Sequence, residues 1–198
     1  MSANPDPTPL DRRAFVAALL GACPEALVIT GLGSPAYDAY AAGDRDRTFY
    51  LWGAMGGAAA MGLGLALAQP GRSVLVLTGD GEQLMGLGAM ATIGVQQPAN
   101  LTLVVLDNGH YGETGMQTSH TGHGVSLAQA ALACGLRWGE RITAMDAVPG
   151  LARRVAARDG CGLAQVLVSA DELPRALPAR DGVWLKGRFR AALGLDPA

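Results

Sequence analysis

Residues 75–115, LVLTGDGEQLMGLGAMATIGVQQPANLTLVVLDNGHYGETG, contain two short apolar runs that each end in polar residues. The first run ends in Gly79-Asp80-Gly81 and the second in Asp107-Asn108, with a helical stretch between them. Continuous apolar runs of this kind are typical of strands whose two faces are both covered. Ligands bind beyond the carboxyl ends of parallel strands, so Asp80 and Asn108 are expected together at a binding edge.

The rest of the chain continues this alternation of strands and helices. Strands that alternate with helices predict an α/β fold, a single three-layer domain with a mostly parallel sheet and helices on both faces. We assign residues 11–198 to this domain and residues 1–10, which are rich in proline, to a flexible N-terminal arm. The basic and apolar tail, residues 180–194, is expected to dock on the domain. Strands are predicted at residues 26–30, 48–51, 72–78, 101–106 and 166–168, and helices at residues 12–20, 53–68, 82–95, 126–134 and 146–158, with another ending near Gly43.

Composition excludes several classes of protein. The chain has 49% hydrophobic and 16% charged residues and a net charge of −2, which favours neither a nucleic-acid-binding nor a membrane-surface protein. The apolar run at residues 51–68 is rich in Gly and Ala, so we expect a tightly packed core helix there and not a membrane span. The first residues lack an apolar signal core. The three Cys residues are widely spaced, which predicts reduced core thiols in a cytoplasmic protein and argues against an iron–sulfur cluster.

The polar residues at the two strand ends have the chemistry of a magnesium–diphosphate site. Magnesium prefers oxygen ligands in octahedral geometry and usually completes its shell with phosphate oxygens and water. A carboxylate from Asp80, an amide oxygen from Asn108 and one backbone carbonyl would leave room for two diphosphate oxygens and a water. Gly79 and Gly81 allow close approach, and the amides of Gly81 and Glu82 open a helix that can donate to the diphosphate. Either motif alone is a common turn, whereas both together favour a binding site.

These motifs resemble the thiamine diphosphate motif, in which GDG is followed at the next strand end by an NN or DN pair. The resemblance implies that Asp80, Asn108 and the backbone carbonyl of His110 bind Mg²⁺, and that Tyr111 lies against the cofactor. It also implies that Gly53 accepts the pyrimidine amino group and that Met55 wedges between the two cofactor rings. A core-filling role is the alternative for Met55. The resemblance covers residues 13–195 and rests on FYLWGAMGGAAAMGLGLALA (49–68), GDGEQLMGLGAMATIG (79–94), PANLTLVVLDNGHYGETGMQ (98–117) and DGVWLKGRFRAAL (181–193).

The loop at residues 109–125 is the expected source of substrate contacts, because such loops carry function. Glu113 and Thr114 lie where the family places substrate-facing side chains, and Glu113 is a candidate acid–base group or pocket wall. His110 and His120 are further candidates for substrate contact or proton transfer. For the three loop histidines, simple solvent exposure and zinc binding are the alternatives, and for Glu113 a surface turn is the alternative.

The resemblance is closest to the β subunits of sulfopyruvate decarboxylase and the C-terminal half of phosphonopyruvate decarboxylase. It implies an enzyme, a carbon–carbon lyase, that converts a small-molecule 2-oxo acid into an aldehyde and CO₂. In the family a Glu on a separate pyrimidine-binding domain completes the site, so we expect a partner α subunit. Three departures are the pair Asp107-Asn108 in place of Asn-Asn, a different loop sequence after it, and the absence of an Arg cluster beside the loop to hold a sulfonate or phosphonate.

Other functions remain open at this stage. A thiamine-dependent carboligase, a 2-oxo acid oxidoreductase subunit and a non-catalytic thiamine diphosphate-binding protein all share the motif. Residues 31–36, GLGSPA, imitate a dinucleotide fingerprint, but no acidic residue ends a suitable second strand.

Overall fold

A six-stranded, entirely parallel sheet forms the centre of the computed structural model, which describes residues 9–196. Each pair of neighbouring strands runs in the same direction, which confirms the prediction of an α/β fold with a mostly parallel sheet. The strand order β2-β1-β3-β4-β8-β7 places β1 and β3 side by side in the middle, where the direction of winding reverses. The strands are β1 (Leu27–Thr30), β2 (Thr48–Tyr50), β3 (Val74–Gly79), β4 (Leu101–Asp107), β7 (Trp138–Ile142) and β8 (Gly162–Leu167).

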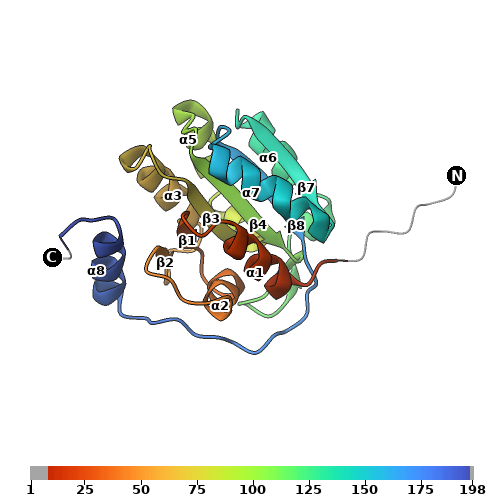
Figure 1. Ribbon diagram of the computed structural model, residues 1–198. Helices are drawn as coiled ribbons and strands as arrows, with labels where there is room; N and C mark the ends of the chain where they lie inside the picture. The colour runs from red at the N-terminus through yellow and green to blue at the C-terminus, as the bar shows by residue number, and fades with distance from the viewer. Residues whose placement is uncertain (1–8, 197–198) are drawn as a thin grey trace, which may run out of the picture.

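Helices cover both faces of the sheet (Figure 1). One apolar core joins the sheet to α1 (Arg12–Ala22), α2 (Ser34–Ala41) and α7 (Val148–Ala157). A second core on the opposite face joins it to α3 (Ala58–Ala68), α5 (Gly88–Gln96) and α6 (Leu127–Ala133). Alternate residues of β3 serve the two cores, because successive strand side chains point to opposite faces. This double coverage explains why the strands read as continuous apolar runs.

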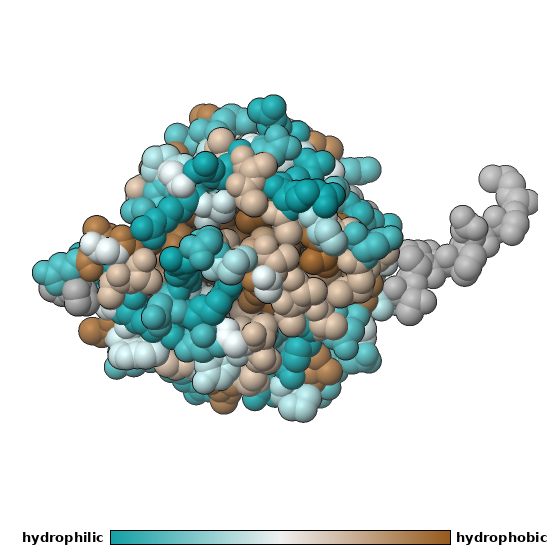
Figure 2. Space-filling model, in the orientation of Figure 1, coloured by the Kyte–Doolittle hydropathy of each residue, from teal (hydrophilic) through white to brown (hydrophobic). Residues whose placement is uncertain are grey.

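The C-terminal helix α8 (Gly182–Ala192) packs beside β2, at the edge of the sheet. Its Phe189 ring meets Phe49 edge-on, with 5.9 Å between the ring centroids. The chain reaches α8 from β8 through an extended segment, residues 169–181, which runs along one end of the molecule past α2 (Figure 1). We call this segment the strap. Figure 2 shows the same side of the molecule, with apolar surface near the centre and hydrophilic side chains around most of its margin.

The helix predicted over residues 53–68 begins five residues later, at Ala58. The backbone of Gly53, Ala54 and Gly56 has positive φ angles of 73°, 48° and 88°, which a right-handed helix does not contain. Residues 53–57 are therefore a looped segment that leads into α3, and Met55 lies on it.

Other predicted boundaries also differ from the structure. The helix predicted over residues 82–95 is two helices, α4 (Asp80–Met85) and α5, which are separated at Gly86. The strand predicted at residues 166–168 is the end of β8, and β7 was not predicted. The loop predicted at residues 109–125 contains a small hairpin of β5 (His110–Tyr111) and β6 (Gln117–Thr118) and a 3₁₀ turn, η1 (Thr121–His123). A second 3₁₀ turn, η2 (Met145–Ala147), precedes α7.

Most of the predicted N-terminal arm lies outside the described residues. Within its last two residues, Leu10 forms a parallel bridge with Val168. Within residues 9–196, no helix is long and apolar enough to cross a membrane. Cys23 and Cys161 are buried, Cys134 is half-buried, and all three are free thiols.

Candidate functional site

The ends of β3 and β4 bring Asp80 and Asn108 to one edge of the sheet. The two strands are paired along their length, with Gly79 opposite Leu106, so the residues that follow these positions emerge together. Both side chains line one cavity of about 260 Å³. This cavity lies at the carboxyl ends of the strands and beside the point where the winding reverses, which is the usual ligand position in open α/β sheets.

Most of the residues predicted for the site line this cavity. Gly53 and His120 do not line it. Gly53 belongs to the looped segment before α3, and His120 contacts the hydroxyl of Tyr111. The predicted residues that line it are Met55, Gly79, Asp80, Gly81, Glu82, Asn108, His110, Tyr111, Glu113 and Thr114. Arg12 and Ser34 are lining residues that the sequence did not indicate.

Asp80 is a buried carboxylate, 2% exposed, that is held by hydroxyl groups. Ser119 donates a hydrogen bond to Asp80 Oδ2, and the Thr121 hydroxyl lies 3.1 Å from the same oxygen. Burial raises the pKa of Asp80, and the nearby charge of Asp107 raises it further, while the hydrogen bonds from Ser119 and Thr121 lower it. A divalent cation bound to this carboxylate would offset the free-energy cost of burying its negative charge. The donor set therefore fits a magnesium ion.

Asp107 does not line this cavity, but its hydrogen bonds hold the loop that carries residues that do. Its Oδ2 accepts a 2.6 Å hydrogen bond from Gln165 Nε2, and its Oδ1 accepts one of 3.0 Å from the Gly109 amide. The Thr121 hydroxyl is 2.7 Å from the same Oδ1. Asp107 accepts from Gln165 and Gly109 and shares the single hydroxyl proton of Thr121 with Asp80, so an acceptor at both oxygens suits this position. Asp107 thereby anchors the loop that follows Asn108.

Asn108 begins the turn into the β5–β6 hairpin. Its Oδ1 accepts a 2.9 Å hydrogen bond from the His110 amide, and His110 Nδ1 lies 2.7 Å from the Asn108 carbonyl oxygen. An amide oxygen has two lone pairs, so Asn108 Oδ1 retains a position for a cation. Within the described residues, no cluster of three or more His, Cys, Asp or Glu side chains forms a metal site. The predicted magnesium site depends instead on one carboxylate, one amide and one carbonyl.

The ring of Tyr111, on the β5–β6 hairpin, packs against the start of α4. A Cβ atom at Gly81 would lie 2.6 Å from Tyr111 Cδ1, so only glycine allows the ring to pack there. The Tyr111 hydroxyl is 2.6 Å from His120 Nδ1. His120 therefore contacts the cavity wall through Tyr111, and its role in substrate contact or proton transfer stays a prediction.

Glu82 contributes a second buried carboxylate to the cavity wall. Its Oε2 accepts a 2.9 Å hydrogen bond from the Thr78 hydroxyl, while Oε1 has no hydrogen-bond partner among the described residues. Burial raises the pKa of Glu82, whereas Thr78 and the backbone amides of Gly56, Ala58 and Leu32 lower it. The sequence predicted a role for the Glu82 amide alone. Its side chain lies between the end of β1, the end of β3 and the start of α3.

The same contacts explain the glycines of residues 31–36. A Cβ atom at Gly31 would lie 1.6 Å from Glu82 Oε2, and one at Gly33 would lie 2.6 Å from Glu113 Oε1. Gly33 also has a φ of +80°. Gly31 is therefore required by the buried Glu82 carboxylate that packs against it, and Gly33 by its positive φ, so the pattern that imitates a dinucleotide fingerprint has a structural explanation.

Comparison with known proteins agrees with this geometry. Residues 35–166 match the family described as thiamine pyrophosphate enzyme, C-terminal TPP binding domain. This chain belongs to that family. Its thiamine diphosphate-binding fold is shared with a Rhodococcus jostii thiamine diphosphate-dependent 4-hydroxybenzoylformate decarboxylase, with a TM-score of 0.70 over 87% of this chain and 35% of that one. At 19% identity, this likeness concerns the fold alone.

Curated relatives of this thiamine diphosphate-binding domain are named decarboxylases. Phosphonopyruvate decarboxylase from Streptomyces viridochromogenes is 38% identical over 193 residues, which cover 94% of this chain and 47% of the relative. Sulfopyruvate decarboxylase subunit beta from Methanocaldococcus jannaschii is 44% identical over 110 residues, which cover 56% of this chain and 58% of the relative. The chain thus spans about half the length of the curated relatives it matches.

Proposed function

We propose that this chain is the diphosphate-binding subunit of a thiamine diphosphate- and Mg²⁺-dependent 2-oxo acid decarboxylase. Its substrate would be of the sulfopyruvate or phosphonopyruvate type, and the products would be an aldehyde and CO₂. A separate pyrimidine-binding subunit would complete the active site. The names of the relatives support this proposal. The observation that carries it is the joint position of Asp80 and Asn108 on one cavity at the ends of β3 and β4.

In the proposed enzyme, the chain holds the cofactor mainly through its phosphates. Asp80, Asn108 and the His110 carbonyl would ligate Mg²⁺, and the amides of Gly81 and Glu82 would donate to diphosphate oxygens. Met55 would separate the two cofactor rings. When bound, thiamine diphosphate supplies the electron sink for decarboxylation.

The loop after β4 would hold and protonate the substrate. Glu113 and Thr114 line the cavity, so their polar atoms are available to a bound 2-oxo acid. The Thr114 hydroxyl is loosely held, at 3.4 Å from the Tyr111 carbonyl and 3.3 Å from Gln117 Oε1. Glu113 would exchange a proton with the substrate carbon or oxygen, and His110 would lie nearby on β5.

Exposed apolar side chains beside the cavity support the need for a partner subunit. Met85 lines the cavity and is 60% exposed, and Met55 and Leu87 are each 40% exposed. Large exposed apolar side chains that gather beside a cavity mark an interaction surface. A pyrimidine-binding domain that covered this rim would also exclude water from the reacting atoms.

Co-expression with a pyrimidine-domain chain encoded beside this one tests the proposal. Purified complex, each chain alone and a mixture would be assayed for CO₂ release from sulfopyruvate, phosphonopyruvate and pyruvate. We expect turnover by the complex and none by this chain alone. Turnover by the single chain would contradict the split site, and absence of turnover by a stable complex loaded with cofactor would contradict the decarboxylase.

An Asp80→Ala variant tests the cation site. We expect the assembled complex to lose magnesium-dependent affinity for thiamine diphosphate by more than about 100-fold, because a direct metal ligand is removed. Calorimetric titration with and without Mg²⁺ measures this loss, and circular dichroism checks that the fold is retained. An unchanged affinity would remove Asp80 from the ligand set.

A further inference from the structure

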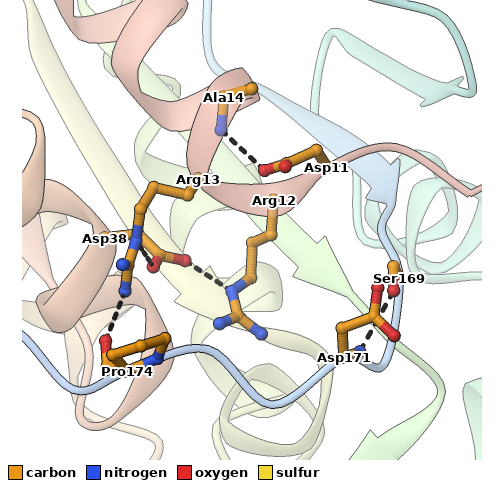
Figure 3. Close-up of polar contacts among 8 residues, drawn as sticks. All are labelled: Asp11, Arg12, Arg13, Ala14, Asp38, Ser169, Asp171 and Pro174. Atoms are coloured by element: carbon orange, nitrogen blue, oxygen red, sulfur yellow. Dashed lines mark hydrogen bonds and ion pairs between the residues drawn. The ribbon is translucent and has the colours of Figure 1, made fainter.

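An arginine pair shares one buried carboxylate at the start of α1. The Nε atom of Arg12 donates to Asp38 Oδ2, and the Nε atom of Arg13 donates to Asp38 Oδ1 at 3.0 Å (Figure 3). Asp38 is fully buried on α2, and Arg12 is only 8% exposed. Arg13 also donates through Nη2 to the Pro174 carbonyl on the strap, at 2.8 Å. Asp38 is thereby paired twice, and the cluster retains one positive charge.

The surplus charge lies at the end of the Arg12 side chain. Figure 3 shows the two terminal nitrogens of Arg12 directed away from Asp38. Neither terminal nitrogen has a hydrogen-bond partner among residues 9–196, and the single ion pair of Arg12 within 4.0 Å in that range is the one with Asp38. A guanidinium carries five N–H donors in a fixed fork that matches an oxyanion, and it loses water when it is buried. The Arg12 terminal nitrogens are not among the buried atoms without partners in the described residues, so they are open to solvent and available to an anion.

Arg12 belongs to the walls of two neighbouring cavities. Arg12 lines both the cavity that contains Asp80 and a second cavity of about 290 Å³. The two cavities share Asn108 and Glu113 as walls, but Asp80 lines only the first. An anion on Arg12 can therefore lie beside the loop after β4 without occupying the place of the diphosphate at Asp80.

The second cavity contains other charges that bear on an anion. Arg175 of the strap lines it, with its guanidinium carbon 5.9 Å from the centre of the Tyr37 ring. Glu113, Asp171 and Glu172 also line it, and all three are exposed, so water and salt screen their charges. Arg12 and Arg13 together carry one positive charge more than Asp38 cancels, and Arg12 is only 8% exposed, so the Arg12 nitrogens favour an anion.

We propose that Arg12 is a specificity-determining residue that receives the second acid group of the substrate, the sulfonate or phosphonate opposite the 2-oxo acid carboxylate. This inference rests on the proposed function and names the receptor that the sequence did not reveal. The fork of Arg12 Nη1 and Nη2 makes two parallel hydrogen bonds to two oxygens of the tetrahedral group. Asp38 fixes the orientation of the fork through Nε, and Arg13 and the strap hold Asp38 in place.

Substrate discrimination by the assembled enzyme tests the proposal. We expect Arg12→Gln to lower kcat/KM for the sulfonate or phosphonate substrate by roughly 10- to 100-fold, the effect of losing charged hydrogen bonds, mainly through KM. Activity on 2-oxobutanoate, which has an uncharged end, should change little. Arg12→Lys keeps the charge but not the fork, so it should give an intermediate loss. Comparison of sulfopyruvate with phosphonopyruvate identifies which acid group the site prefers.

Arg13→Gln is the matched comparison, because it breaks the other ion pair of Asp38 but keeps the Arg12 fork. We expect its preference for the substrate with two acid groups to fall clearly less than that of Arg12→Gln. Equal losses in the two variants on all substrates would show that Arg12 has only a structural role and would overturn the proposal. A loss of thiamine diphosphate affinity in Arg12→Gln, as large as its loss of substrate affinity, would assign Arg12 to the diphosphate and would overturn it also.

A binding measurement separates this inference from the proposed function. Sulfoacetate and phosphonoacetate, which carry two acid groups, would be titrated calorimetrically into the purified chain. We expect binding that Arg12→Gln abolishes and Arg13→Gln only weakens, even if no 2-oxo acid is decarboxylated. Failure of decarboxylation alone would count against the proposed reaction, whereas identical binding by the native chain and Arg12→Gln would overturn the Arg12 site.

Discussion

Asp80 lowers the folding stability of the metal-free chain and provides a candidate metal ligand. Its carboxylate is buried beside Asp107, and burial together with that neighbouring charge raises its pKa. In the metal-free chain, the charged form is therefore less favourable folded than unfolded. A bound cation would offset this free-energy cost. Asp80 therefore suits the chain with a cation bound and lowers the stability of the metal-free chain.

Asp80→Asn should stabilise the metal-free chain at pH 7, because it removes the buried charge and keeps an oxygen that accepts from Ser119. We expect the thermal midpoint to rise by a few degrees, roughly 2–4 °C per kcal/mol in a chain of this size. Between the ordinary pKa of 3.8 and the raised folded pKa, the folded native chain holds a proton that the unfolded chain has lost. Its stability therefore falls as the pH rises through that window, and Asp80→Asn should reduce this fall.

Thermal unfolding from pH 4 to pH 8 without Mg²⁺ measures the effect. Asp159→Asn, which alters an exposed pair with Arg154 at 3.6 Å, is the control and should change the midpoint little. A lower midpoint for Asp80→Asn at pH 7 would mean that the hydrogen bonds of the carboxylate outweigh its burial.

The residues of the candidate site were predictable to different degrees. Asp80 and Asn108 follow directly from apolar runs that end in oxygen ligands, since adjacent parallel strands end at one edge. Thr121 and Arg12 could not be found in this way. Thr121 reaches Asp80 across a folded loop, and Arg12 belongs to a helix that precedes the first strand. Such contacts depend on the packed arrangement, and no local pattern marks them.

At the scale of elements, two glycines determine where the Met55 segment lies. Gly56 has a φ of +88°, and a Cβ atom at Gly86 would lie 2.1 Å from the Gly56 carbonyl oxygen. The break between α4 and α5 therefore packs directly on the segment before α3. Periodicity predicted one long helix in each place, because small residues fit a helical pattern and positive φ angles leave no apolar signature.

Gly86→Ala should displace the segment that carries Met55. The added methyl group meets backbone, which cannot rotate away, so we expect a loss of about 1–3 kcal/mol in the free energy of unfolding. Cofactor affinity in the assembled complex should fall as well. Gly88→Ala is the matched control, because a Cβ atom there meets nothing within 4 Å and alanine favours the helix. Chemical denaturation of both variants measures the difference, and equal stability would show that the Gly56 contact is relaxed.

The strand β7 illustrates the limit of pattern recognition for elements. Trp138 and Ile142 are buried at its ends, but Gly139, Glu140 and Arg141 between them are at least partly exposed. An edge strand needs few apolar residues, and charged residues there prevent pairing with other chains. The buried strands β3 and β4 were recognised because nearly all of their positions are apolar, whereas β8, which contains Gly162 and Gln165, was recognised only at its end.

At the scale of the whole molecule, the alternation of apolar strands and helices predicts the fold. It does not predict which surface would bind the proposed partner subunit. Parallel strands require crossover helices on both faces, which fixes the layers. No sequence pattern identifies the surface that would bind the partner, since exposed apolar residues occur on every protein. It becomes visible only where Met55 and Met85, each at least 40% exposed, line the same cavity.

Leu87→Lys should impair assembly with the pyrimidine-domain partner. Leu87 is 40% exposed and lies two residues after Met85, which lines the cavity, so the change places a charge on the proposed interface without altering the cavity wall. Burial of an unpaired ammonium group is costly, and we expect the dissociation constant of the complex to rise on the order of tenfold or more. Val95→Lys is the control, because Val95 is 80% exposed near the other end of α5. Co-purification and analytical ultracentrifugation compare the two, and equal assembly would place the partner on another face.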